Sequence, residues 1–253
     1  MGTKFSTRIW VGVVGIASIF WGSKGYADTV VSVADFGLKP DTRENAVAYV
    51  QKAIEACRGK EPVTLVFPEG RYDFWPQYAH EKNYYETNTY DVFPKRLAML
   101  FEGFHNITVD GNGSQFVMHD RIQPITVENC DGVTLKNFSI DWDIPLTAQA
   151  RVIKVGSDFF EIEINVLESP YIIEDGKLVF VGEGWKSALG SMIEFESDTH
   201  FVVPGTGDLV LGRNWRDYTA VSPRYGIVRL SRKGGFERYP AEGKSRRPSG
   251  LRK

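Results

Sequence analysis

Two aspartates near the middle of the chain, Asp141 and Asp143, flank Trp142. On a strand, residues two apart share one face, with Cα atoms about 6.6–6.8 Å apart. Inverting glycosidases hold their acid and base carboxyls roughly 6.5–9.5 Å apart, and a nearby like charge raises the pKa of a carboxyl toward that of a general acid. Asp141 and Asp143 are therefore candidate catalytic residues. The alternatives are a sugar-binding pair or residues that hold backbone amides at a strand end.

A second acidic pair, Glu194 and Glu196, repeats this spacing around Phe195. Alternation of apolar and acidic residues is typical of a half-exposed strand, so we expect these glutamates to face water.

Aromatic residues gather around a long polar segment, residues 77–94. Their faces can stack on the apolar faces of sugars, and loops on rigid scaffolds often carry binding sites. We take Trp142, Trp75, Tyr84 and Tyr85 as candidate substrate-binding residues. The alternative is that the aromatic side chains anchor their own loop. The aromatic residues in and next to this loop are Trp75, Tyr78, Tyr84, Tyr85 and Tyr90.

Metal and cofactor motifs are not evident in the sequence. The four histidines, His80, His105, His119 and His200, form no pair at metal-ligand spacing. The segment 110–113, Asp-Gly-Asn-Gly, lacks the alternating acids of a calcium loop and predicts a turn. We therefore expect no metal and no cofactor.

The composition of the 253 residues is that of an ordinary globular protein, with a net charge of −2. That charge gives no nucleic-acid footprint. The 25 glycines and 13% aromatic residues favour a turn-rich β architecture.

Residues 1–27 have the order of a secretory signal peptide. Lys4 and Arg8 precede an uncharged run, Ile9 to Trp21, and Gly25-Tyr26-Ala27 supplies small residues at a cleavage site. Since a bilayer crossing needs about 20 apolar residues, we expect no membrane span in the mature chain and an exported, periplasmic or extracellular protein. Export would permit Cys57 and Cys130 to pair, but the sequence favours two free thiols.

A helix is predicted from Asp41 to Gly59. Asp41 and Glu44 have the spacing of a capping box, and apolar residues then recur on one helical face. Short strand signals follow as far as Trp142. The segments His105–Val109 and Asp131–Leu135 share one pattern 26 residues apart (105 to 131), a period typical of one solenoid coil. The helix is suited to cap the open end of such a solenoid.

The sequence texture changes after residue 146. Segments of alternating apolar and polar residues, joined by tight turns, predict an inserted antiparallel β-barrel or sandwich over residues 147–220. We expect residues 221–243 to return toward the solenoid. The basic residues 244–253 are expected to form a disordered tail, and no capping element for an open solenoid end is visible there.

Several motifs together resemble the amino-terminal part of bacterial α-1,3-galactosidases, right-handed parallel β-helix glycosidases that act on blood-group-B-type glycans. The matching segments are 35–37 (DFG), 67–70 (FPEG), 107–113 (ITVDGNG), 137–143 (NFSIDWD), 202–208 (VVPGTGD) and 214–215 (NW). The resemblance covers about residues 30–243, and members of that family are about twice as long as this chain.

The resemblance implies an all-β protein: the first coils of a right-handed parallel β-helix with an amino-terminal capping helix (28–146), plus the inserted barrel. It further implies metal-independent inverting hydrolysis of terminal α-1,3-linked galactose, with galactose-terminated glycans as partners. The acid and base of that family lie on later coils, so the chain as written is expected to be truncated before them and inactive. The alternatives are a non-catalytic β-helix glycan-binding or surface protein and a pectate-lyase-like enzyme.

Overall fold

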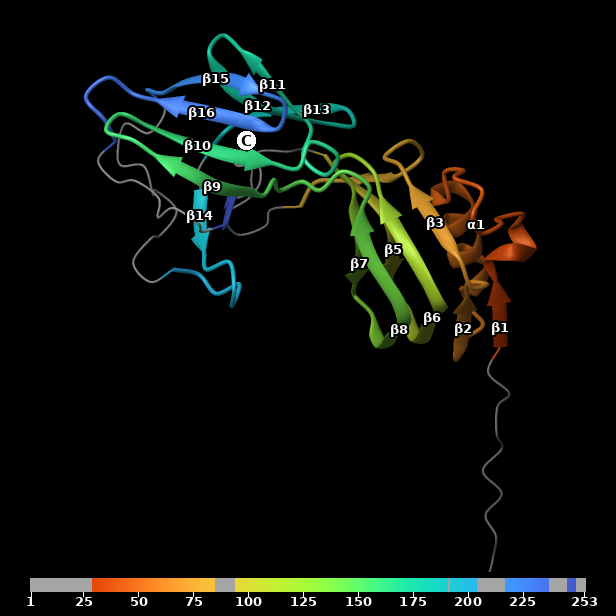
Figure 1. The fold of residues 1–253 in the computed structure, drawn as a ribbon. Helices are drawn as coiled ribbons and strands as arrows, with labels where there is room; N and C mark the ends of the chain where they lie inside the picture. Colours follow the sequence, from red (N-terminus) through yellow and green to blue (C-terminus); the bar gives the residue numbers. More distant parts are fainter. Residues whose placement is uncertain (1–28, 85–93, 191, 204–216, 237–244, 249–253) are drawn as a thin grey trace, which may run out of the picture.

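The computed structural model describes residues 29–84, 94–190, 192–203 and 217–236, together with the backbone of 245–248. The chain is mostly β and forms two modules that lie side by side (Figure 1). We call residues 29–146 the parallel module and residues 148–248 the antiparallel module. Within the described residues, no helix has the length and apolar character that a bilayer crossing requires.

The parallel module contains two sheets. The elements are β1 (Thr29–Ser32), η1 (Val33–Phe36), α1 (Val47–Cys57), β2 (Val63–Val66), β3 (Arg71–Phe74), β4 (His80–Lys82), β5 (Lys95–Glu102), β6 (His105–Met118), β7 (Gln123–Glu128) and β8 (Asp131–Trp142). In the first sheet the long strand β6 pairs in parallel with β2, then with β3, and along its length with β8. In the second sheet β5 lies between β4 and β7.

The 26-residue recurrence matches the pairing register of β6 with β8. His105 pairs with Asp131 and Ile107 with Val133, in parallel. The ladder then shifts between Asp110 and Ser114, so the predicted turn is a corner inside β6. Gly111 allows close approach at that corner, because a Cβ there would lie 2.5 Å from the Cβ of Phe138.

The predicted helix begins later than its sequence signal. α1 starts at Val47, where the Asn45 side chain accepts a hydrogen bond from the Val47 amide at 3.1 Å. Asp41 has φ 63°, outside the helical region, and its carboxylate accepts from the Arg71 amide at 2.9 Å. The capping-box prediction was therefore wrong, because a tertiary contact engages Asp41.

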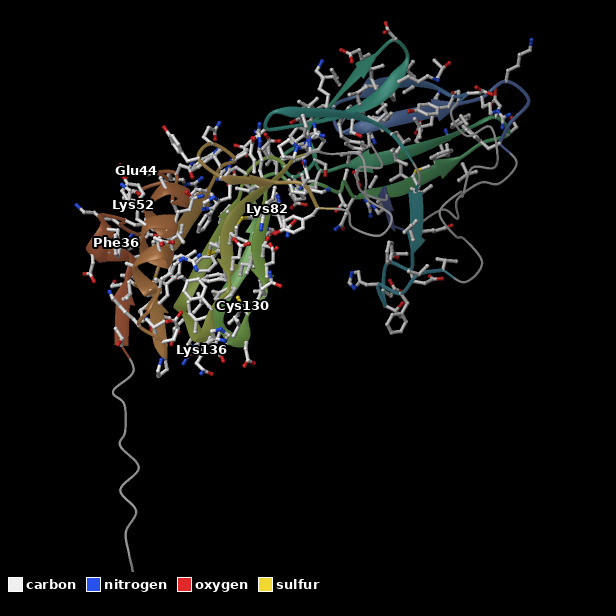
Figure 2. All side chains as sticks on the ribbon, turned by 180° about the vertical axis from the view of Figure 1, so that it is seen from behind. Phe36, Glu44, Lys52, Lys82, Cys130 and Lys136 are labelled. Carbon is white, nitrogen blue, oxygen red and sulfur yellow. The ribbon has the colours of Figure 1, made fainter. Side chains whose placement is uncertain are left out.

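The apolar face of α1 was predicted correctly. Val47, Val50, Ile54 and Cys57 are all buried in the core of the parallel module. Glu44 and Lys52 lie at the end of this module that is remote from the antiparallel module (Figure 2). Both cysteines are free, Cys57 buried and Cys130 partly buried.

The antiparallel module also contains two sheets. Its strands are β9 (Ala150–Val155), β10 (Phe159–Ile164), β11 (Tyr171–Glu174), β12 (Lys177–Gly182), β13 (Trp185–Ala188), β14 (Met192–Phe195), β15 (Thr219–Arg224), β16 (Ile227–Ser231) and β17 (Ser245–Pro248). Their orders are β14-β17-β9-β10-β16-β15 and β11-β12-β13. Apolar side chains from both sheets form a second core, separate from the first.

Three expectations about this module differ from the structure. Residues 221–231 do not return to the parallel strands, because β15 and β16 pair antiparallel with each other and β16 pairs with β10. The backbone of Ser245–Pro248, expected in a disordered tail, pairs with β14 and β9. Glu194 is 2% exposed rather than facing water, because the inward face of β14 carries it beside Met192.

Candidate functional site at the junction of the modules

Arg71 and Asp73 form the base of a charged site at the end of β3. Residues two apart on a strand share a face, and the Arg71 guanidinium accordingly donates from Nε and Nη2 to the Asp73 carboxylate at 2.6–3.0 Å. The Asp73 side chain is fully buried, and Arg71 is largely buried.

His119 follows β6 and connects Asp73 to the antiparallel module. Its Nε2 lies 2.8 Å from Asp73 Oδ1, and its Nδ1 lies 2.6 Å from Oε2 of Glu183, in the β12–β13 turn. The imidazole is 2% exposed, and the Trp75 ring stacks on it at 3.8 Å with an 11° tilt. Strong ring packing and two short polar contacts fix its orientation.

Asp143 completes the site from the end of β8. Its Oδ1 accepts a hydrogen bond from Arg71 Nη2 at 2.8 Å and lies 3.7 Å from the Arg43 guanidinium. Its side chain is 36% exposed, so it is the part of the site most open to solvent apart from Arg43. We call Arg71, Asp73, His119, Asp143 and Glu183 the junction cluster.

The cluster holds Asp73 as a carboxylate. Burial alone would raise the pKa of Asp73, but hydrogen bonds from Arg71 and His119 outweigh it and hold the pKa below its ordinary value. The same contact with Asp73, and next the hydrogen bond to Asp143, raises the pKa of Arg71. This buried carboxylate can orient Arg71 and His119, but it cannot donate a proton.

The donor atoms of Asp73, His119 and Asp143 lie within 4.8 Å of one another, a spacing that a metal ion could bridge. However, the Arg71 guanidinium already donates to both carboxylates, and both ring nitrogens of His119 face carboxylate oxygens. A metal would have to displace these contacts and share the space with a fixed positive charge. The donor set fits an ion-pair network better than a metal site.

Asp141 and Asp143 do not act as a pair in this arrangement. Asp141 is exposed, and its carboxylate accepts from the Trp142 amide at 2.8 Å. Trp142 donates from its indole Nε1 to the Asp120 carbonyl at 3.2 Å. Asp143 is therefore associated with Asp73 through Arg71, whereas Asp141 caps its own neighbour.

The aromatic candidates Trp75 and Tyr84 lie beside different groups of the protein. Trp75 stacks on His119 beside the junction cluster. The Tyr84 hydroxyl contacts the Glu128 carboxylate, which also accepts from Lys82 Nζ at 2.6 Å. Tyr85 and Tyr90 lie outside the described residues, as do most of 202–208 and all of 214–215 in the sequence motifs noted above.

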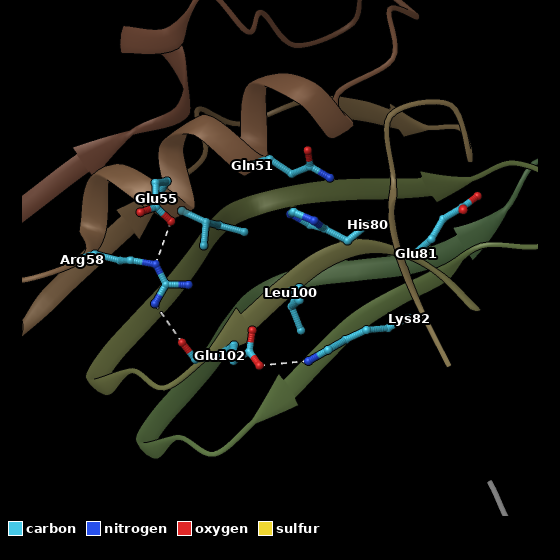
Figure 3. A pocket seen from close by; sticks show the side chains of 9 residues that line it. Gln51, Glu55, Arg58, His80, Glu81, Lys82, Leu100 and Glu102 are labelled. Atoms are coloured by element: carbon cyan, nitrogen blue, oxygen red, sulfur yellow. Dashed lines mark hydrogen bonds and ion pairs between the residues drawn. The ribbon is translucent and has the colours of Figure 1, made fainter. Parts of the chain in front are cut away.

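A second polar site lies between α1 and the β4–β5 ladder (Figure 3). This cavity of about 280 Å³ is lined by Gln51, Ile54, Glu55, Arg58, His80, Glu81, Lys82, Leu100 and Glu102. Arg58 donates to Glu55 at 2.6 Å and to the Glu102 carbonyl at 2.9 Å, while Lys82 contacts the Glu102 carboxylate at 2.9 Å. Arg58 and Lys82, the cationic donors of this cavity, are therefore already bound to protein groups.

Four members of the junction cluster were missed by reasoning from the sequence. His119 is 46 residues from Asp73 and 64 from Glu183, and Arg71 is 72 from Asp143. Local spacing carries no signal for such contacts. The one usable signal was the Arg71–Asp73 spacing on a predicted strand, which places opposite charges on one face.

Comparison with known proteins agrees with this architecture. Residues 148–245 match the family described as GLAA-B beta-barrel domain I. Alpha-1,3-galactosidase B of Bacteroides thetaiotaomicron is 55% identical over 219 residues, which are 86% of this chain and 35% of that protein. Alpha-1,3-galactosidase A of Shewanella woodyi is 37% identical over 169 residues, 66% of this chain and 28% of the relative.

A third relative, alpha-1,3-galactosidase B of Phocaeicola vulgatus, is 36% identical over 79% of this chain and 32% of its own length. The chain thus spans about a third of the length of the curated relatives it matches. Over most of its own length, the chain is a partial homologue of alpha-1,3-galactosidase B.

Proposed function

We propose that this chain is part of a glycoside hydrolase that removes terminal α-1,3-linked galactose from glycans. The observation that carries the proposal is the 55% identity to an alpha-1,3-galactosidase B over 86% of the chain. Identity at this level extends across both modules, so it supports a shared role for the whole segment and not for the barrel alone.

We further propose that the parallel module is the beginning of a right-handed parallel β-helix. Two features support this. β5 and β6 pair with β7 and β8 respectively, so each pair of strands lies on the preceding pair. The corner at Asp110 recurs in the next layer at Asn137, which has φ 59°. Further coils would cover β8, whose Leu135 and Ile140 are exposed.

In the proposed reaction one carboxylic acid protonates the leaving oxygen while a carboxylate activates water on the opposite face of the sugar, giving inversion without a metal. Asp143 accepts a hydrogen bond from Arg71 and its side chain is partly open to solvent, which suits that residue to bind sugar hydroxyls. Since this chain spans about a third of its relatives, we propose that the reacting acid–base pair includes residues outside this sequence.

A second candidate is glycan binding without turnover. It is favoured by the same ion pairs, because Arg71 engages Asp143 while Asp141 caps the Trp142 amide. Trp75 and Trp142, both partly exposed, would then supply the sugar-stacking faces. Export of the protein by way of residues 1–27 is proposed for either function, since glycan substrates lie outside the cell.

The test is an assay of the purified 253-residue chain with a blood-group-B trisaccharide, alongside a calorimetric binding titration. Binding without hydrolysis that weakens on Asp143→Asn is expected. Turnover abolished by Asp141→Asn or Asp143→Asn would contradict the placement of the acid–base pair. If this chain and a longer protein containing it both fail to bind and to hydrolyse the trisaccharide, both candidate functions are contradicted.

A further inference from the structure

We propose that His119 is a proton-dependent latch between the two modules. In its doubly protonated form it bridges Asp73 of the parallel module and Glu183 of the antiparallel module. Loss of one ring proton releases Glu183 and loosens the β12–β13 turn from the parallel module. This inference concerns the joint between the modules and does not depend on the proposed function.

Both ring nitrogens of His119 contact carboxylate oxygens. Nδ1 lies 2.6 Å from Glu183 and Nε2 lies 2.8 Å from Asp73. A carboxylate can only accept hydrogen bonds, whereas a neutral imidazole donates from one nitrogen and accepts at the other. Both contacts can therefore be hydrogen bonds at once only when each nitrogen carries a proton. After deprotonation, one ring nitrogen presents a lone pair to a carboxylate, so that hydrogen bond is lost.

The surrounding charges decide which contact is lost. Asp73 is fully buried and retains three hydrogen bonds from Arg71 on its own strand. Glu183 is 35% exposed and lies in a turn, and within the described residues its one side-chain hydrogen bond is to His119. Glu183 can therefore turn toward water at small cost, so its contact is the one that opens.

Other charged groups also face the ring. Asp143 has a carboxylate oxygen within 4.8 Å of a ring nitrogen of His119, so it is a third carboxylate beside Asp73 and Glu183. Arg71 carries the opposite charge and is itself held by Asp73 and Asp143. Trp75 closes one face of the ring against water.

The turn that carries Glu183 is seated closely on the parallel module. A Cβ at Gly184 would lie 2.5 Å from Asp120 Oδ2, so backbone and side chain are already in contact there. Asp120 in turn accepts through its carbonyl from Trp142. Opening the His119–Glu183 contact would thus expose backbone on both sides of the joint, in segments 119–121 and 182–185.

The experiment is hydrogen exchange of the full 253-residue chain from pH 6 to pH 9, corrected for the intrinsic pH dependence. Protection of segments 119–121 and 182–185 should fall about tenfold as His119 deprotonates, which is about 1.4 kcal/mol. The β9–β10 ladder inside the antiparallel module should not change. Nitrogen NMR of labelled histidine should show two ring protons on His119 at pH 6.

Two variants make the result specific. In Glu183→Gln the pH dependence should disappear, because the side chain no longer supplies a charged acceptor. Glu174→Gln is the matched control, since Glu174 pairs with Lys186 on the exposed surface of the same module, and it should retain the wild-type profile. The proposal is overturned if wild-type protection is independent of pH, if Glu183→Gln keeps the wild-type profile, or if His119 is neutral at pH 6.

Discussion

Phe116 of β6 stacks on Phe138 of β8 with ring centroids 4.7 Å apart and ring planes 23° apart. Phe67, which follows β2, lies on the other side of Phe116 at the same 4.7 Å. Three layers of the parallel module are thus joined through one column of aromatic rings. The column lies beside the corner at which β6 changes its pairing partner.

This column predicts a large loss of stability for Phe116→Ala. The side chain is 0% exposed, so truncation removes buried area and leaves a cavity, which costs about 3–5 kcal/mol. Phe201→Ala is the control, since Phe201 is 73% exposed and should change stability by less than about 0.5 kcal/mol. Urea unfolding followed by circular dichroism measures both. Equal effects from the two variants would contradict the packing described.

Gly184→Ala should weaken the joint between the modules. Gly184 has φ +74°, which costs a non-glycine residue about 1–2 kcal/mol, and its new Cβ would also meet Asp120. Gly234 has φ +84° with open space around it, so Gly234→Ala isolates the backbone cost. We expect Gly184→Ala to lower the melting temperature several degrees further than Gly234→Ala. The same shift from both substitutions would show that the contact with Asp120 contributes nothing.

Acid should remove the contribution of Asp73 to stability. Its folded-state pKa lies below the ordinary 3.8, so the folded state binds this proton less tightly than the unfolded chain. The stabilisation is therefore fully present above about pH 4 and is lost as the pH falls through the lowered folded-state value. Asp73→Asn should cost about 3 kcal/mol at pH 6, and the difference from wild type should shrink toward pH 2.

Unfolding titrations at several pH values provide the measurement. The exposed Asp131→Asn serves as the control and should track the wild-type curve throughout. A cost for Asp73→Asn that is constant from pH 2 to pH 6 would mean that the Asp73 charge does not stabilise the fold.

Cys57 should be inert in the folded protein. Burial raises the pKa of its thiol to about 11, and its Sγ lies 3.2 Å from the Ala53 carbonyl. In a Cys130→Ser variant, which leaves Cys57 as the one thiol, a thiol reagent at pH 8 should react only after denaturant is added. Rapid labelling of the native variant would place Cys57 at the surface and contradict the packing of α1.

Features set by local periodicity could be predicted from the sequence. The buried face of α1 follows helical spacing, and the register of His105 with Asp131 follows the 26-residue recurrence. Features set by distant partners could not. Asp41 has the spacing of a helix cap, yet the Arg71 backbone competes for its carboxylate.

The same reason limits prediction of the site. The sequence indicates Asp143 as a candidate, but its side chain accepts a hydrogen bond from Arg71 and does not pair with Asp141. His119 offers no local pattern, because its hydrogen-bond partners come from β3 and from the other module. Glu194 shows the converse error, since alternation on β14 predicted two faces but not which of them is inward.

The most direct test of the proposed function replaces the homologous segment of Bacteroides thetaiotaomicron alpha-1,3-galactosidase B with residues 29–248 of this chain. The hybrid is assayed on a blood-group-B trisaccharide, with proton NMR to identify the galactose anomer that is released first. We expect hydrolysis within about tenfold of the parent rate, with β-galactose appearing first, as inversion of an α-linkage requires. A folded, soluble hybrid that releases no galactose, or that releases α-galactose first, would contradict it.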